Sequence, residues 1–216
     1  MRLLFIIFSV VLLVYFLSSP GETPYNYFTR LSESLLSGKL YLTQNPPWLN
    51  ELVPVNGKYY VVYPPMPAIV LMPYIFFFGE HASQTMFSII LGAVNVILVY
   101  LLCKRLNCSI KTSLLVTFFF ALGTNHWYLS SVGSAWFIAH ITALFFLLLA
   151  LLETFGKQRL LLIGLLLGAS FWARTPVIFT AFFFYIYFCK KFWPINRKNI
   201  YNFLLLNLGI LFFVLL

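Results

Sequence analysis

Apolar runs of helix length alternate with short polar breaks along most of this chain. The first run covers residues 3–17, and a longer, more polar segment follows it over residues 18–83. Runs this long and this frequent predict helices that cross a membrane, because a helix needs about 20 apolar residues to span the hydrocarbon core. The later predicted spans are residues 84–103, 113–123, 137–152, two within 160–188, and 201–216.

Composition excludes the other broad classes of protein. Hydrophobic residues make up 62% of the chain and charged residues only 9%, whereas soluble domains are about one quarter charged. A soluble fold of 216 residues has too little interior for so much apolar surface. Disordered chains are poor in aromatic residues, which reach 20% here. We therefore expect an all-α polytopic membrane protein with about seven transmembrane helices, forming a single transmembrane domain over residues 1–216.

The charges predict the orientation of these spans. The net charge is +9, and ten of the fourteen Lys and Arg residues fall in segments that lie inside if the N-terminus is cytoplasmic. The break between the third and fourth runs has no Lys or Arg, as the positive-inside rule expects of an external loop. We expect a multi-pass protein of the plasma (inner) membrane, with residues 18–83 as its first external loop. No nucleic-acid partner is expected, because the bases are not gathered on one solvated face.

The first external loop is expected to carry two juxtamembrane helices. The first covers residues 24–37, with Thr23 as N-cap, Pro24 in its first turn and Gly38 as its stop signal. The second covers residues 66–78, an apolar segment that two prolines interrupt. If this segment crossed the membrane, the basic loop after the next span would be external, so we expect it to lie at the outer surface or to re-enter the membrane there.

Arg174 interrupts the apolar stretch 160–188, which is too long for one span and short for two. Basic breaks flank both ends, so two helices are required, each with about 14 residues and about 21 Å long. The chain should turn near Arg174 and Pro176, because proline disfavours helix at the residue before it. Arg174 would then lie below the outer surface. It is either a snorkelling arginine at a helix end or an anion clamp, since a guanidinium suits the geometry of phosphate.

A polar, aromatic and uncharged cluster follows the third run. It contains His126, Trp127 and several serines, and His140 follows on the next run. One interpretation is an ordinary aromatic belt with a capping loop. The other is a hydrogen-bonding wall for a polar ligand at the membrane surface. We expect His126 to lie in the loop and His140 to be buried in the protein.

Glu22 is the leading candidate for a catalytic carboxylate. It follows the first span and precedes the first juxtamembrane helix, whose N-terminus would favour the ionised form. A carboxylate near a phosphate-binding arginine suits transfer from a lipid-linked phosphate donor, with the acid as general base on an acceptor hydroxyl. The alternative is that Glu22 is only a capping charge. Glu33 is the second candidate, and the alternative there is an uninvolved surface charge.

Several short motifs together resemble the GT-C membrane glycosyltransferases that use polyprenyl- or dolichyl-phosphate sugars, the RgtA/B/C/D-like and protein-mannosyltransferase-like enzymes. The motifs are Gly21-Glu22-Thr23-Pro24, Tyr27 to Gly38, Tyr63-Pro64-Pro65-Met66-Pro67, Phe78-Gly79, Gly164 to Gly168 and Ala173-Arg174-Thr175-Pro176. The chain departs from the family in having Glu where Asp is usual. It also ends inside an apolar run, so the resemblance implies that it is the N-terminal half of a longer enzyme.

The resemblance implies a role for each candidate site residue. Glu22 would be the base, and Arg174, with Lys58 as a weaker candidate, would contact the donor phosphate. Aromatic and imidazole side chains would line the sugar or the lipid. These are Tyr59, Tyr60, Tyr63, His126 and Trp127. Some relatives use a divalent cation (Mg²⁺ or Mn²⁺) and others do not; with one good carboxylate we expect no tightly held, protein-ligated metal.

The sequence thus favours an inverting membrane glycosyltransferase. Its donor would be a polyprenyl-phosphate sugar, and its acceptor a hydroxyl on a glycan, lipid or protein at the outer membrane face. Two alternatives stay open, a multi-pass transporter or lipid flippase and a non-catalytic membrane subunit. Transporters usually show internal repeats or broken helices near mid-depth, whereas here the polar residues gather in the external segments.

Overall fold

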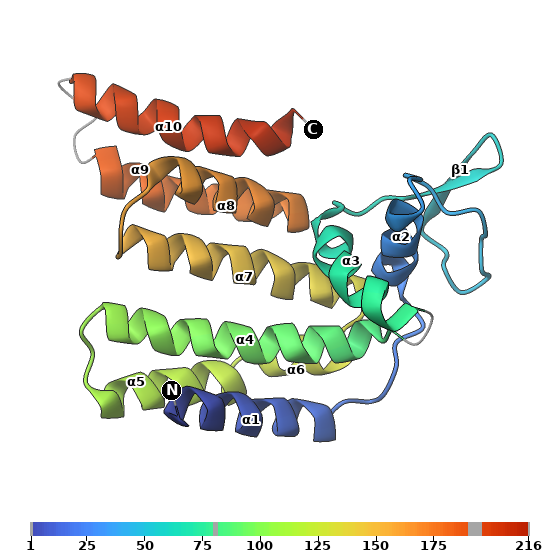
Figure 1. Cartoon of the computed structure of the whole chain (residues 1–216), viewed down its shortest axis with the longest axis horizontal. Coiled ribbons are helices and arrows are strands. Elements are labelled where there is room, and N and C mark those ends of the chain that lie inside the picture. Colours follow the sequence, from blue (N-terminus) through green and yellow to red (C-terminus); the bar gives the residue numbers. More distant parts are fainter. Residues whose placement is uncertain (1, 80–81, 190–195, 216) are drawn as a thin grey trace.

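The computed structural model describes residues 2–79, 82–189 and 196–215, and most of them are helical. The predicted helical class is confirmed, with one small β-hairpin in addition. The helices of the predicted spans lie side by side as a stack of roughly parallel rods (Figure 1). They are α1 (Arg2–Leu17), α4 (Gln84–Arg105), α5 (Ile110–Leu122), α7 (Ala135–Thr154), α8 (Leu160–Ala173), α9 (Ala181–Cys189) and α10 (Arg197–Val214).

Helix length decides how many of these could cross a membrane unaided. Among the described helices, α4 and α7 are the two that are long and apolar enough to do so. α1, α5 and α8 have 16, 13 and 14 residues. A helix of 14 residues rises about 21 Å, short of a hydrocarbon core of about 30 Å. The expected number of about seven transmembrane helices is therefore not supported by helix length and composition.

The predicted break in the apolar stretch 160–188 is confirmed. α8 ends at Ala173, the 3₁₀ helix η2 (Thr175–Thr180) follows Arg174, and α9 then returns along the stack (Figure 1). Arg174 has an extended backbone with φ −152° and ψ 109°. Pro176 lies in the first turn of η2, a position that suits proline, and the chain reverses at the extended residue before this turn. The basic residues Lys190 and Lys191, expected to follow this helix, lie outside the described residues.

Polar contacts join the helices of the stack. The phenol of Tyr15 on α1, which is fully buried, donates to the carbonyl of Ala121 on α5 at 2.9 Å. On α4, the buried Asn95 amide donates to the carbonyl of Ile141 on α7 at 3.0 Å. α8 and α10 approach so closely that a Cβ on Gly164 would lie 2.3 Å from the carbonyl oxygen of Leu206. The helix order is therefore fixed by specific contacts within an apolar interior.

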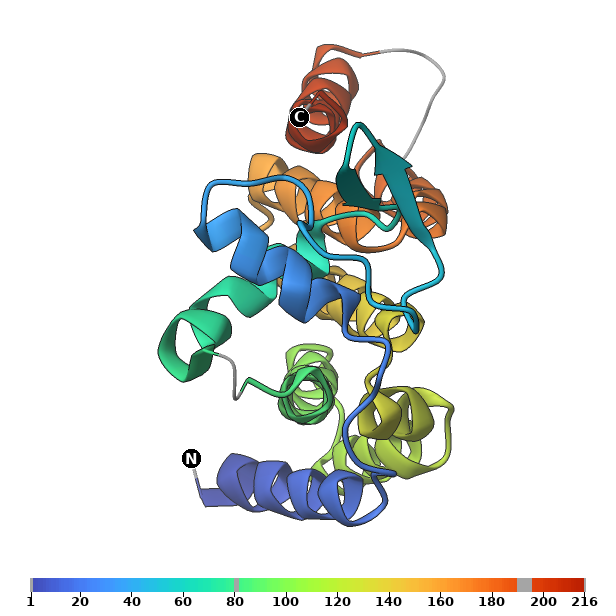
Figure 2. The same cartoon turned by 90° about the vertical axis from the view of Figure 1, so that its right-hand side faces the viewer.

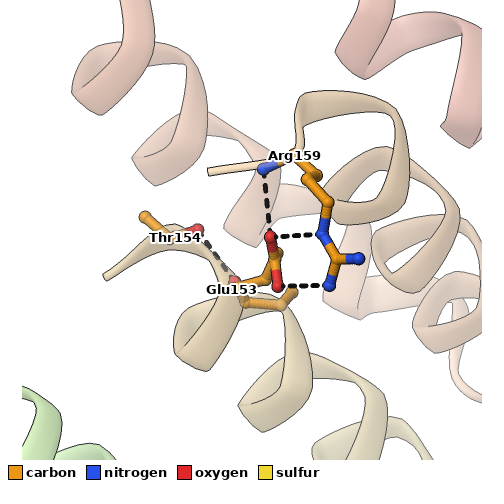
Figure 3. A network of polar contacts seen from close by, with 4 residues as sticks. Glu153, Thr154 and Arg159 are labelled. Atoms are coloured by element: carbon orange, nitrogen blue, oxygen red, sulfur yellow. Dashed lines mark hydrogen bonds and ion pairs between the residues drawn. The ribbon is translucent and has the colours of Figure 1, made fainter. Parts of the chain in front are cut away.

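An ion pair closes the connection between α7 and α8. The Arg159 Nε and Nη2 groups donate to the two carboxylate oxygens of Glu153 at 2.9 and 3.0 Å (Figure 3). The backbone N–H of Arg159 also donates to Glu153 Oε1. This bidentate ion pair fixes the geometry of the loop. Because the Arg159 side chain is 58% exposed, we expect the pair to contribute little to stability.

Residues 18–79 form a separate layer at one end of the stack, opposite the loops that join α4 to α5 and α7 to α8 (Figures 1 and 2). Lys and Arg residues lie in those loops or in the helix turns next to them, so the chain separates this basic end from the predicted external segment. The elements of the layer are α2 (Tyr27–Leu36), β1 (Leu52–Val55), β2 (Lys58–Val61) and α3 (Met66–Phe78). The two strands are antiparallel, and Asn56 and Gly57, both with positive φ, form the turn between them.

The start of α2 was predicted wrongly. The helix begins at Tyr27 instead of Pro24, and the Asn26 side chain makes no capping hydrogen bond. The cap comes from α4: Gln84 Oε1 accepts from the backbone N–H groups of Phe28 and Thr29 at 3.2 and 3.4 Å. Thr23 instead donates its N–H to Thr85 Oγ1 at 3.1 Å. Residues 23–26 are therefore held against α4, and the helix starts only after them.

Candidate functional site

Glu22 lies at the N-terminus of α4, not at that of α2 as predicted. Its carboxylate accepts a hydrogen bond from the Ser83 hydroxyl. The same Ser83 Oγ caps α4 by accepting from the Met86 N–H at 3.0 Å. Glu22 is therefore held at the N-terminus of α4, the longest of the described helices.

Three hollows meet at Glu22. The first, about 460 Å³, is lined almost wholly by polar residues of α2 and of the approach to α4. The second, about 260 Å³, lies toward α1 and α4 and includes Phe16 and Ile89. The third, about 390 Å³, lies toward α7 and includes Tyr25 and Trp136. The carboxylate is exposed, so it faces one polar space and two more apolar ones.

Arg174 lies at the same end of the stack, immediately after α8. Its side chain is partly buried, and the Nε group is buried without a hydrogen-bond partner among the described residues. No described carboxylate is found within ion-pair distance of its guanidinium. The guanidinium interacts electrostatically with the His140 ring, which is no counter-ion. A cation in such a position favours an anion as its partner.

A fourth hollow, of about 410 Å³, includes Val177, three residues after Arg174, in its lining. Val177 of η2 and apolar residues of α5, α6 (His126–Val132) and α7 form most of its wall. The polar groups in the lining are Thr124, Asn125, His126 and His140. It therefore combines an apolar wall with a few convergent polar groups, the composition that small-ligand sites commonly have.

Neither histidine has the environment that was predicted for it. His126 begins helix α6 instead of lying in an open loop, and only 3% of it is exposed. Its Nε2 is 3.2 Å from the Gly92 carbonyl oxygen, and Nδ1 has no partner among the described residues. Burial lowers the pKa of His126 to about 4. His140, predicted to be buried, is exposed.

Trp127 connects α6 to the end of α1. Its indole N–H donates to Ser18 Oγ at 2.7 Å, and the ring is 37% exposed. Ser18 also lies 3.3 Å from Ser131 Oγ. Trp127 therefore has a structural partner, and part of its ring faces outward.

The hairpin residues are held by contacts within their own layer. The Lys58 ammonium lies 4.3 Å from the centre of the Tyr41 ring, a cation–π contact. Tyr60 packs on the same Tyr41 ring at 6.1 Å, and the Tyr59 backbone pairs with Leu42. The hairpin projects away from the stack (Figure 1). The structure therefore gives these three predicted site residues local partners and does not place them in the wall of any hollow described above.

Tyr63 is the member of this group that packs inside the layer. Its ring lies 5.5 Å from that of Tyr27 and 6.0 Å from that of Phe28. Its hydroxyl is buried without a partner among the described residues. The Tyr63-Pro64-Pro65 segment leads into Met66, which belongs to the same apolar cluster as Ala173 and Val177, on either side of Arg174. The approach to α3 therefore helps to position the turn that carries Arg174.

Sequence reasoning missed most of the polar hollow. Asn26, Thr29, Arg30 and Ser83 line it with Glu22, and Glu33, weighed only as an alternative base, lines it too. The signal was present, because residues 26, 30 and 33 recur at helical spacing, away from the apolar positions. These two glutamates are the carboxylates that could ligate a divalent cation here. Within the described residues, no three His, Cys, Asp or Glu side chains are grouped as a metal site.

Comparisons of the chain with protein-family models, with curated proteins and with solved structures found no match.

Proposed function

We propose that this chain is the membrane-embedded part of a glycosyltransferase that uses a polyprenyl-phosphate sugar as donor and works at the outer face of the membrane. One observation carries the proposal: the Glu22 carboxylate faces a polar hollow and two more apolar hollows, at the end of the stack where the Arg174 guanidinium has no anionic partner among the described residues. A polar acceptor and a lipid-linked donor need such a pair of environments around one base.

The reaction follows from these two charged groups. Glu22 takes the proton of the acceptor hydroxyl as general base. The hydroxyl oxygen bonds to the anomeric carbon of the sugar as the bond from that carbon to the phosphate oxygen breaks. The oxygen attacks from the face opposite the phosphate, so the configuration inverts. Arg174 stabilises the charge that develops on the leaving polyprenyl phosphate.

The start of α7 connects the two groups. Trp136 lines the hollow that contains Glu22, and His140, one helical turn later, interacts with Arg174. One turn rises about 5.4 Å, which is shorter than the length of a phosphosugar. We propose that the sugar ring lies along this face of α7, between the base and the guanidinium.

The membrane placement is part of the proposal. Large apolar side chains are exposed along α1, α5, α9 and α10, among them Phe5, Phe119, Phe182 and Leu208. Continuous exposed apolar surface of this extent suits lipid better than water. We propose that the seven apolar segments cross the membrane, the short ones with local thinning. Residues 18–83 then lie outside and the basic loops inside.

A transfer assay in membranes tests this function. Membranes from cells expressing the complete reading frame are incubated with radiolabelled polyprenyl-phosphate glucose and polyprenyl-phosphate mannose. Glu22→Gln is expected to reduce transfer by at least ~100-fold, and Arg174→Gln by a similar factor. Glu153→Gln, the same change at the opposite end of the stack, is the matched control and should retain transfer. Unchanged transfer by Glu22→Gln, at normal expression and unfolding temperature, would remove Glu22 as the base.

One observation favours a second candidate function, a lipid transporter or flippase. Val177, three residues after Arg174, lines a largely apolar hollow of about 410 Å³, and the guanidinium could accompany a phospholipid head group along it. If the protein is a flippase, donor lipid should cross the membrane of vesicles that contain Glu22→Gln as fast as it crosses that of wild-type vesicles. Neither protein should then transfer sugar. A non-catalytic subunit predicts neither activity.

A further inference from the structure

We infer that the polar hollow beside Glu22 is the acceptor subsite, and that it takes the ring of an uncharged sugar or an amino sugar. This inference rests on the proposed function and narrows its acceptor to a glycan hydroxyl. The hollow holds about 460 Å³, room for a monosaccharide ring. Its polar lining residues are Glu22, Asn26, Thr29, Arg30, Glu33 and Ser83.

One buried group in this lining points to a ligand. Thr29 is only 7% exposed, and its Oγ1 is buried without a partner among the described residues. A buried hydroxyl normally has a hydrogen-bond partner, because leaving it unsatisfied costs free energy. A sugar hydroxyl in the hollow would supply that partner.

Arg30 provides the second feature of a sugar site. Its Nε donates to Asn26 Oδ1 at 3.2 Å, and among the described residues its Nη1 and Nη2 groups make no hydrogen bond. The guanidinium also lies 6.0 Å from the centre of the Trp48 ring, and 51% of Trp48 is exposed. The Trp48 contact holds the guanidinium in position. Its remaining N–H groups can then donate to adjacent ring hydroxyls, while carboxylates on the other side accept from them.

Charge restricts the kind of sugar. Among the described residues, the lining has two carboxylates, Glu22 and Glu33, and one guanidinium, so the formal charge of this described part is negative. An acceptor carrying phosphate or carboxylate would be repelled, whereas a neutral or amino sugar would not. The neighbouring hollows toward α1 and α7 have more apolar linings. We therefore assign the lipid-linked donor to that side and the acceptor glycan to the polar hollow.

Saturation-transfer NMR on the purified protein in detergent tests the inference without depending on catalysis. The probes are methyl β-glucoside, methyl β-glucosaminide and methyl β-glucuronide, which share a ring and differ in charge. The first two should bind, and the glucuronide should bind at least about five-fold more weakly. Arg30→Met should weaken glucoside binding roughly ten-fold or more, with Lys39→Met as the matched control that leaves binding unchanged. Thermal unfolding verifies that both variants are folded.

The outcomes separate this inference from the proposed function. Glucoside binding that Arg30→Met and Glu33→Gln leave unchanged would overturn the subsite, even if Glu22→Gln abolishes transfer. Glucuronide binding as tight as that of the glucoside would overturn the argument from charge. Conversely, glucoside binding lost in Arg30→Met supports a glycan site here even where Glu22→Gln leaves transfer unchanged, a result that would count against the base alone.

Discussion

Single residues in this protein act through partners that are distant in sequence. Glu22 has its hydrogen bond from Ser83, and Ser83 in turn caps α4. The local sequence around Glu22 predicts a charge on α2, but the hydroxyl that orients it lies sixty-one residues away. A base needs its carboxylate held in one geometry, so the start of α4 belongs to the site as much as Glu22 does.

At the residue scale, His126 predicts how stability depends on pH. Burial lowers its pKa from 6.5 to about 4 in the folded protein, so between these pH values the unfolded chain binds a proton that the folded chain does not. The free energy of unfolding therefore rises with pH across this window, by roughly 3 kcal/mol for this residue. This contribution to the free energy of unfolding is fully present above about pH 6.5 and is lost as the pH falls toward 4.

The measurement is thermal unfolding of the purified protein in detergent from pH 4 to pH 7.5. His126→Gln keeps a donor for the Gly92 carbonyl and removes the titration, so its unfolding temperature should change less with pH than that of the wild type. Equal pH profiles for both proteins would show that His126 takes up its proton in the folded state as well.

At the scale of elements, Gln84 couples the external layer to the stack. Its side chain is fully buried, accepts from two N–H groups of α2 and donates to the carbonyls of Gly133 and Tyr25. One amide therefore joins α2, α4 and the connection between α6 and α7. Its loss leaves several buried backbone groups without partners, and each such group costs about 1–3 kcal/mol.

Gln84→Met, of similar size and without the polar groups, is expected to lower the free energy of unfolding by roughly 2–4 kcal/mol. It should also reduce sugar transfer, because α2 lines the polar hollow. Gln44→Met, the same change at an exposed position, should change stability by less than about 0.5 kcal/mol. Chemical denaturation in detergent measures both variants. A Gln84→Met protein as stable as wild type would show that water or other groups replace the amide.

At the scale of the whole molecule, the basic loops and the layer of residues 18–79 lie at opposite ends of the stack (Figure 1). If the stack crosses a membrane, these two ends face different compartments. The positive-inside rule places the basic end in the cytoplasm. The candidate site, which lies between the layer and the stack, would then face the outside.

Cysteine labelling in intact cells tests this orientation. Val55→Cys, on the exposed hairpin, should react with a membrane-impermeant maleimide, whereas Lys157→Cys, in the α7–α8 loop, should react only after permeabilisation. Val55 suits the test better than Gly57, whose φ of +74° disfavours a side chain. The native cysteines 103, 108 and 189 are first replaced by serine. The opposite pattern of labelling would place the site in the cytoplasm and end the proposed reaction.

Local signals are strong enough to predict much of the stack. α8 begins at Leu160 and α4 at Gln84, as the apolar runs predict, and the turn at Arg174 follows from Pro176. The hairpin turn is equally local, because Asn56 and Gly57 tolerate positive φ. The number of helices that cross a membrane was less predictable, because whether a short helix crosses depends on neighbouring helices that hydropathy does not describe.

The sequence by itself determined the helical class, the order of the apolar helices, the turn at Asn56 and Gly57 and the separation of basic loops from the segment 18–83, because periodicity, turn residues and charge act over a few neighbouring positions. Only the tertiary structure decided that α2 is capped by Gln84, that Glu22 is held at α4, and that His126 is buried while His140 is exposed. Hydrogen bonds and burial depend on which groups meet in space. Those contacts form only when the whole stack has packed.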